Sequence, residues 1–193
     1  MLKLPYYGTY HHTTYEQSEM IRSILKDCFI KEFQKISHDH VREILDAGCG
    51  LGYLSELSAV YFPGSKVTGV DLFGSRSLPE GEMSLAIDNM KALKLEERVK
   101  FVKSDLSKLS LLDETYDLAV SNLVYHNLGR SRFEGYRELA RVIRTGGYFI
   151  IGDLFHTRNR DIEFLESYFY LLNKELVIPG MPRNYSLFLF KKR

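Results

Sequence analysis

The chain has 193 residues, of which 45% are hydrophobic and 26% are charged. This balance excludes a disordered or fibrous protein, and a chain of this length buries enough surface, roughly 70%, to fold without disulfides or a structural metal. The formal net charge is only +1, so no overall positive field favours a nucleic-acid substrate.

The cysteines and the N-terminus bear on the cellular compartment. Cys28 and Cys49 are the only cysteines, too few for a disulfide framework or a zinc-ligand pattern. The first residues lack a long apolar signal segment, and no stretch approaches the ~20 apolar residues of a membrane span. We therefore expect a cytoplasmic protein outside the membrane, with no bound metal; no oligomeric state is predicted.

Hydrophobic periodicity predicts the elements in chain order. Apolar residues recur at three- and four-residue steps from Glu16 to Ile36, which indicates a first helix. Five apolar runs bounded by Gly, Asp or Asn predict strands, and they are Val41–Leu45, Lys66–Val70, Val99–Val102, Tyr116–Val120 and Gly147–Ile151. Helical patterns lie between them at about residues 51–61, 82–94 and 131–143.

This alternation predicts an α/β fold, a Rossmann-like doubly wound sheet that is mostly parallel, with helices on both faces. A helix near residues 158–173 follows the fifth strand. The runs Leu176–Ile178 and Ser186–Phe190 then suggest an antiparallel C-terminal hairpin at one sheet edge. We expect one domain over residues 1–193, with residues 1–37 as its helical cap; the Gly-Ser-Pro stretch Phe73–Gly81 is assigned only as a loop.

A glycine-rich turn follows the first predicted strand. Gly48, Gly50 and Gly52 open a helical segment, a context in which glycine lets backbone amides approach a ligand. A dinucleotide fingerprint, G-x-G-x-x-G, would need glycine where Tyr53 stands. The observed G-x-G-x-G spacing therefore favours another nucleotide-type ligand, although many strand-to-helix turns use glycine for geometry alone.

Acidic residues follow the next two predicted strands. Asp71 lies 21 residues after Gly50, where α/β cofactor sites place an acid on ribose hydroxyls. Asp105 follows the third strand, where its carboxylate can accept from an adenine amino group. Either aspartate alone is explained equally well as a cap, Asp105 through Ser107 and Lys108. The glycines and both acids together favour a cofactor site.

These motifs resemble those of the class I S-adenosylmethionine (SAM) dependent methyltransferases, from about Val41 to Lys192. The nearest branch looks like the small-molecule enzymes similar to those of quinone biosynthesis. The matching segments are Ile44–Gly52, Val67–Leu72, Val102–Leu106, Tyr116–Leu128 and Leu139–Leu154. Two features depart from the family: a longer loop replaces D-x-S-x-x-M after the second strand, and no N-P-P-Y motif follows the fourth.

The resemblance implies S-adenosyl-L-methionine as the cofactor and assigns residues to it. Asp46, Gly48 and Gly50 would line its methionyl part, and Asp71 would hold the ribose. Three further residues complete the implied site, with Leu72, Asp105 and the Leu106 backbone on the adenine side. Asn122, at the end of the fourth strand, is assigned to the methionyl group or the methyl acceptor.

The chemistry narrows the catalytic candidates. A sulfonium methyl is already activated, so the enzyme mainly aligns the acceptor and excludes water. A hydroxyl or carbon acid also needs a general base, and His126 is the best-placed candidate, although a lone loop histidine is often structural. The aromatic stretch Tyr6–Tyr15 either forms a lid or packs the first helix onto the sheet; we expect Tyr10 or Tyr15 to border the cofactor pocket.

The predicted function is methyl transfer from SAM to a small-molecule O, N or C acceptor, releasing S-adenosylhomocysteine. Nucleic acid is an unlikely partner on the charge argument. The alternatives are a nucleic-acid or protein methyltransferase and a noncatalytic SAM-binding subunit. A dinucleotide-dependent oxidoreductase is disfavoured by the glycine spacing.

Overall fold

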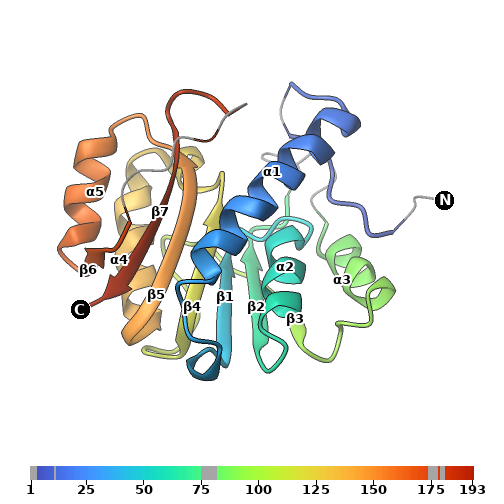
Figure 1. The fold of residues 1–193 in the computed structure, drawn as a ribbon, viewed down its shortest axis with the longest axis horizontal. Coiled ribbons are helices and arrows are strands. Elements are labelled where there is room, and N and C mark those ends of the chain that lie inside the picture. Colours follow the sequence, from blue (N-terminus) through green and yellow to red (C-terminus); the bar gives the residue numbers. More distant parts are fainter. Residues whose placement is uncertain (1–3, 11, 75–81, 174–177, 179–180) are drawn as a thin grey trace.

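A seven-stranded sheet forms the centre of the protein (Figure 1). The computed structural model describes residues 4–10, 12–74, 82–173, 178 and 181–193. The strand order is β3-β2-β1-β4-β5-β7-β6. The strands are β1 Glu43–Ala47, β2 Lys66–Asp71, β3 Val99–Lys103, β4 Tyr116–Asn122, β5 Ile143–Leu154, β6 Phe169–Leu171 and β7 Tyr185–Lys192. The first five pair in parallel and β7 runs antiparallel to both β5 and β6, which confirms the predicted fold class.

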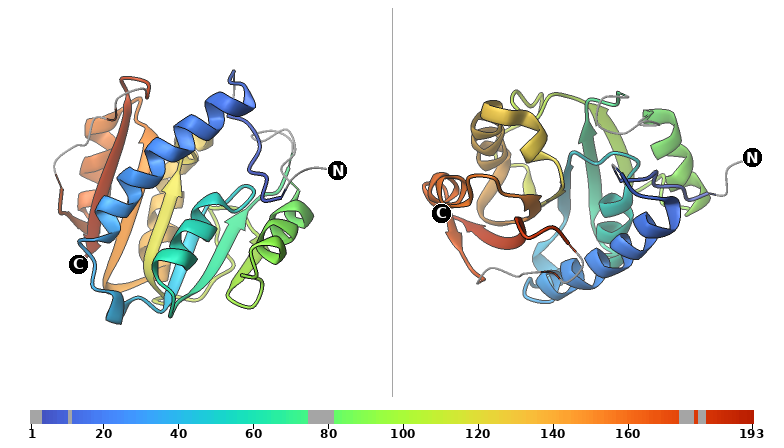
Figure 2. Two further views of the ribbon diagram at one scale, coloured as in Figure 1. Left: turned by 45° about the vertical axis from the view of Figure 1, so that its right-hand side comes forward. Right: turned by 90° about the horizontal axis from the view of Figure 1, so that it is seen from above.

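Helices cover both faces of this sheet (Figure 2). The α-helices are α1 Tyr15–Phe33, α2 Tyr53–Tyr61, α3 Met83–Ala92, α4 Arg132–Val142 and α5 Arg158–Glu166, and the short 3-10 segments are η1 His38–His40 and η2 Tyr125–Ser131. Side chains of α1, α2 and α3 pack in one core layer with the sheet, and those of α4 and α5 pack in the other.

Alternating residues of the strands supply the two core layers. On β1, Ile44 belongs to the layer under α1 and α2, whereas its neighbour Leu45 belongs to the layer under α4. Both side chains are fully buried. Burying each contributes roughly 1.5–3 kcal/mol relative to leaving it exposed. The near-continuous apolar runs of the sequence are thus explained by a sheet that is buried on both faces.

The first helix, α1, packs along one face of the sheet. It begins with a capping box, in which the Thr14 side chain accepts from the Gln17 backbone and the Gln17 side chain accepts from the Thr14 backbone. One stripe of α1, with Leu25, Phe29 and Phe33, is buried in the core. The helical cap therefore shares its hydrophobic layer with the strands.

The predicted helix over residues 158–173 is wrong in its last part. Helix α5 ends at Glu166, and Phe169–Leu171 form strand β6, paired with the C-terminal strand β7. Phe169 is fully buried, with its ring centroid 6.0 Å from that of Phe149 and 6.0 Å from that of Phe190. This aromatic packing favours an extended backbone over continued helix.

The edge of the sheet is still closed by an antiparallel pair of strands, as expected. Its first member is β6 rather than the predicted Leu176–Ile178, of which residues 176 and 177 lie outside the described residues. The predicted loop Phe73–Gly81 also lies outside them from residue 75 onward. Among the helices that the structure describes, none is long and apolar enough to cross a membrane.

The strand order places the functional candidates. Strand β1 lies between β2 and β4, so the direction of winding reverses there. Open α/β sheets bind ligands outside the carboxyl ends of the strands at such a switch point. The glycine turn after β1 and the acid at the end of β2 meet at this edge.

Candidate functional site

The glycine turn after β1 has a backbone that suits glycine. Gly48, Gly50 and Gly52 have φ angles of +80°, +50° and +89°, in the left-handed region that disfavours other residues. A Cβ atom on Gly48 would lie 2.3 Å from the Val124 side chain. Glycine is therefore needed here so that the turn can pack against the segment that follows β4.

Asp71, at the end of β2, holds this turn in place. Its Oδ2 accepts a hydrogen bond of 3.0 Å from the Gly50 backbone N–H, and its Oδ1 accepts one of 3.0 Å from the Phe73 backbone. The side chain is only half-buried. Because each carboxylate oxygen has two lone pairs, capacity remains for a ligand with hydroxyl groups.

Asp46 lies in the interior beneath the turn. It is 1% exposed, and the Ser55 hydroxyl donates to its Oδ2 over 2.6 Å. Burial raises its pKa to about 7; the Ser55 hydrogen bond opposes this rise and the negative charge of Asp71 adds to it. Asp46 is therefore a buried acid that titrates close to neutral pH.

The adenine-side candidates have contrasting surroundings. Leu72 is 55% exposed beside Asp71, whereas Leu106 is buried in the second core layer. Asp105 is exposed, and its Oδ1 accepts from both the backbone N–H and the hydroxyl of Ser107. The local cap expected as the alternative for Asp105 is present, so its contact with adenine stays a prediction.

Asn122, at the end of β4, is oriented by a buried tyrosine that the sequence did not reveal. The Tyr185 hydroxyl from β7 donates to Asn122 Oδ1 over 2.7 Å. Because Tyr185 occupies the amide oxygen, the amide nitrogen of Asn122 points away from Tyr185 and can donate a hydrogen bond to another group. A Cβ atom at Gly152 would lie 2.0 Å from the Tyr185 hydroxyl and 3.0 Å from Asn122 Oδ1, so this arrangement requires glycine at that position.

His126 is paired with Asp153, which lies near the end of β5. The distance between His126 Nδ1 and Asp153 Oδ1 is 2.5 Å. The backbone N–H groups of Tyr125, His126 and Leu154 also donate to this carboxylate. Asp153 is 1% exposed. Three backbone donors thus hold the buried carboxylate in position against the imidazole.

This pairing determines which ring nitrogen of His126 is free to accept a proton. An ionised carboxylate only accepts hydrogen bonds, so the proton of a neutral imidazole sits on Nδ1 and the lone pair on Nε2. The sequence prediction missed Asp153. Its signal was an acid after an apolar strand, the same pattern that singled out Asp71 and Asp105.

A cavity of about 150 Å³ adjoins the pair. Its wall contains a second imidazole, His156, and an ion pair in which Arg132 Nε lies 2.5 Å from Asp161 Oδ1. The lining residues are His126, Gly129, Arg132, Tyr136, Asp153, Leu154, Phe155, His156, Thr157 and Asp161. The mixture of donors, acceptors and apolar walls suits a small polar molecule. Sequence reasoning had not connected His156, Arg132 or Asp161 with the site.

Comparison with known proteins identifies the family. Residues 45–151 match the family described as Methyltransferase domain. The chain belongs to this methyltransferase family. The methyltransferase is also 30% identical over 165 residues, 79% of its length, to the sterol 4-C-methyltransferase of Caenorhabditis elegans, and the aligned part is 46% of that protein.

The chain is also similar to two further methyltransferases. The U6 snRNA (guanine-N(2))-methyltransferase of Mus musculus is 29% identical over 111 residues, which are 56% of this chain and 20% of that one. A SAM-dependent methyltransferase from Aquifex aeolicus has the same fold, with a TM-score of 0.65, 21% identity and coverage of 86% and 88% of the two chains. The chain spans less than half the length of the two curated relatives named here.

The residues at the carboxyl edge of the sheet fit the cofactor of this family, S-adenosyl-L-methionine, as the sequence motifs predicted. The half-buried Asp71 carboxylate has lone pairs for a ribose diol, and the exposed apolar side chain of Leu72 beside it is suited to cover a purine ring. The positive-φ glycine turn brings backbone close to the same edge.

Proposed function

We propose that this methyltransferase moves a methyl group from SAM to a hydroxyl or carbon acid of a small molecule, with His126 as the general base. The observation that carries the proposal is the His126 Nδ1 to Asp153 Oδ1 contact of 2.5 Å beside a polar cavity. The bound cofactor supplies an activated methyl group. The protein's task is then to orient the acceptor, remove its proton and exclude water.

In this proposal the two residues of the pair have different roles. His126 takes the acceptor's proton on Nε2, which makes the imidazole cationic. The buried carboxylate of Asp153 stabilises that cation and keeps the ring from rotating, since its own position is fixed by backbone donors. Asp153 does not need to take up the proton itself.

The cofactor is proposed to lie along the glycine turn, from the β4 end to β2. Asp71 accepts hydrogen bonds from the ribose, and Leu72, Asp105 and the Leu106 backbone border the adenine. Asp46, Gly48 and Gly50 form the methionyl end, to which Asn122 donates through its amide nitrogen. Support for the last role comes from the hydrogen bond that Tyr185 donates to the Asn122 oxygen.

A small-molecule acceptor is supported by the modest size of the cavity and by the near-zero net charge of the chain. The likeness to a sterol methyltransferase agrees with it. The proposed compartment is the cytoplasm, which rests on two buried thiols, Cys28 and Cys49, that form no disulfide.

The test combines an acceptor screen with one pair of variants. Purified protein is incubated with SAM labelled on the methyl group and with a small-molecule extract or total RNA. We expect label in the small-molecule fraction, and a loss of about 100-fold or more in kcat for His126→Gln, with unchanged SAM affinity. His156→Gln is the matched control, because this second imidazole lies 6.5 Å from His126 between ring centroids, and it should retain most of the rate.

Two outcomes would contradict the proposal. Label found in RNA would favour an RNA methyltransferase, the activity for which the Mus musculus relative is named. Tight SAM binding without transfer to either fraction would favour a noncatalytic SAM-binding subunit.

A further inference from the structure

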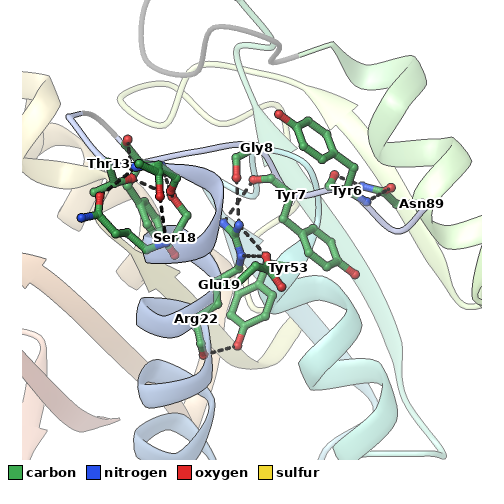
Figure 3. Close-up of polar contacts among 12 residues, drawn as sticks. Tyr6, Tyr7, Gly8, Thr13, Ser18, Glu19, Arg22, Tyr53 and Asn89 are labelled. Atoms are coloured by element: carbon green, nitrogen blue, oxygen red, sulfur yellow. Dashed lines mark hydrogen bonds and ion pairs between the residues drawn. The ribbon is translucent and has the colours of Figure 1, made fainter. Parts of the chain in front are cut away.

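The N-terminal residues Leu4–Tyr10 are here called the N-terminal strap. Figure 3 shows Tyr6 beside Asn89, and Tyr7 and Gly8 beside Arg22. The strap contacts α3 through Tyr6, α2 through Tyr7 and α1 through Gly8. These contacts join three helices that pack in the same core layer on one face of the sheet. The strap, whose last residue Tyr10 is one of two candidates expected to border the cofactor pocket, is therefore placed to affect the cofactor site.

Asn89, on α3, forms the inner attachment of the strap. Its Oδ1 accepts from the Tyr6 backbone N–H over 2.8 Å, and its Nδ2 donates to the Tyr6 carbonyl over 2.7 Å. The same Nδ2 donates to the carbonyl of Leu51, in the glycine turn, over 2.9 Å. Asn89 is fully buried. One side chain thus connects the strap directly to the turn.

Arg22, on α1, forms an outer attachment. Its guanidinium donates to the carbonyls of Gly8 over 2.8 Å and Tyr7 over 3.4 Å, and it is 4% exposed. The Tyr53 hydroxyl, at the start of α2, donates to the Arg22 carbonyl over 2.5 Å. The Tyr7 hydroxyl also donates to the Glu56 carboxylate. The strap is consequently fixed at both ends of its path over α2.

We propose that Asn89 is a positioning residue for SAM, which couples docking of the N-terminal strap to the cofactor-binding form of the glycine turn. The proposal rests on the cofactor lying at that turn, as proposed above. Because the same amide bonds Tyr6 and Leu51, ordering either segment lowers the cost of ordering the other. Cofactor binding that rigidifies the turn should therefore also rigidify the strap.

The chemistry of the contact calls for an amide. Tyr6 presents both a donor and an acceptor, and Leu51 presents a second acceptor. A neutral amide has both kinds of group. An aspartate would lack the two donor bonds, and an apolar residue would leave buried backbone groups unsatisfied.

The test is a double-variant cycle on the full chain, read by calorimetric titration with SAM. Asn89→Ala removes the side chain, and Tyr6→Pro removes the backbone N–H that donates to it. We expect each to raise the Kd for SAM about tenfold, and the double variant to raise it little further. Tyr6→Ala is the matched control, because it loses the ring but keeps the N–H, and it should have a smaller effect than Tyr6→Pro.

Hydrogen exchange of the strap amides gives a second readout, independent of turnover. SAM should slow exchange over Leu4–Tyr10 in the wild-type chain and much less in Asn89→Ala. If Asn89→Ala does not fold, the comparison of Tyr6→Pro with Tyr6→Ala carries the same test.

The proposal is overturned if Asn89→Ala and Tyr6→Pro act additively on the Kd, or if SAM leaves strap exchange unchanged. Either result with normal SAM binding by the wild type would leave the proposed function standing. Absence of SAM binding by the wild-type chain would instead remove the proposed function.

Discussion

At the scale of single residues, the site depends on contacts between strand ends that are distant in sequence. Asp153 Oδ1 and His126 Nδ1 come from residues 27 apart, and the Tyr185 hydroxyl reaches Asn122 across 63 residues. In each pair, one member is buried and holds a partner that faces the site. Substitutions at the buried members should therefore be costly because they release the partner that faces the site.

Gly152 gives a direct test of this packing. Gly152→Ala would place a methyl group 2.0 Å from the Tyr185 hydroxyl, so we expect it to destabilise the fold by roughly 1–3 kcal/mol through overpacking. Gly74→Ala is the control, because no atom lies within 4 Å of its Cβ position. Urea unfolding of both variants is the measurement, and equal stabilities would refute the description of the Asn122 environment.

Asp46 predicts a pH dependence of stability. Its pKa is about 7 in the folded protein and near 3.8 when unperturbed, because burial disfavours its charge. Because the pKa is raised in the folded protein, protonated Asp46 makes its full contribution to the unfolding free energy below about pH 4. This contribution is lost as the pH rises toward 7.

The comparison is with Asp46→Asn, which cannot titrate. Relative to that variant, the wild type should lose roughly 1 kcal/mol of unfolding free energy per pH unit between about pH 5 and 7. Urea titrations at three pH values measure this difference. Parallel pH profiles for the two proteins would show that Asp46 is not a buried acid of raised pKa.

Several residue positions could be predicted from the sequence, and others could not. Asp71 and Asn122 were predicted as site residues because they stand at strand ends, where α/β folds bind ligands. Asp153 carried the same signal but was missed, because its partner His126 belongs to another strand connection. Tyr185 had no sequence signal, since it acts through β7, whose place in the sheet depends on tertiary packing.

At the scale of elements, periodicity located most helices and parallel strands, and it failed where packing outweighed local pattern. The segment after α5 reads as helix in sequence, yet Phe169 is buried against Phe149 and Phe190 in an extended conformation. Strand order was likewise not available from local pattern, because insertion of β7 between β5 and β6 involves pairing over long sequence distances.

The short strand β6 should depend strongly on this one side chain. Phe169→Ala removes a fully buried ring and should cost about 3–5 kcal/mol of unfolding free energy. Tyr170→Ala, the adjacent residue with 52% exposure, is the control and should cost much less. Comparable losses for the two variants in urea unfolding would mean that β6 does not hold its alternating, half-buried register.

At the scale of the whole molecule, the two faces of the sheet have separate tasks. The layer with α1, α2 and α3 carries the strap and borders the glycine turn, and the layer with α4 and α5 borders the cavity proposed for the acceptor. The carboxyl edge of the sheet joins them. A cofactor at β1 and β2 and an acceptor at β4 and β5 would therefore be supported by different core layers. Substitutions near β1 and β2 should then change SAM affinity, whereas substitutions near β4 and β5 should change the rate of methyl transfer.

The central claim is that SAM binds at the glycine turn with Asp71 on its ribose, and calorimetric titration of Asp71→Ala tests it most directly. The wild type should bind SAM, and the variant should bind it about 10- to 100-fold more weakly, equivalent to the loss of about 1–3 kcal/mol. Asp88→Ala, on the exposed face of α3, should bind like the wild type. Unchanged SAM affinity in Asp71→Ala would contradict the account and reduce the glycine turn to a structural feature of the fold.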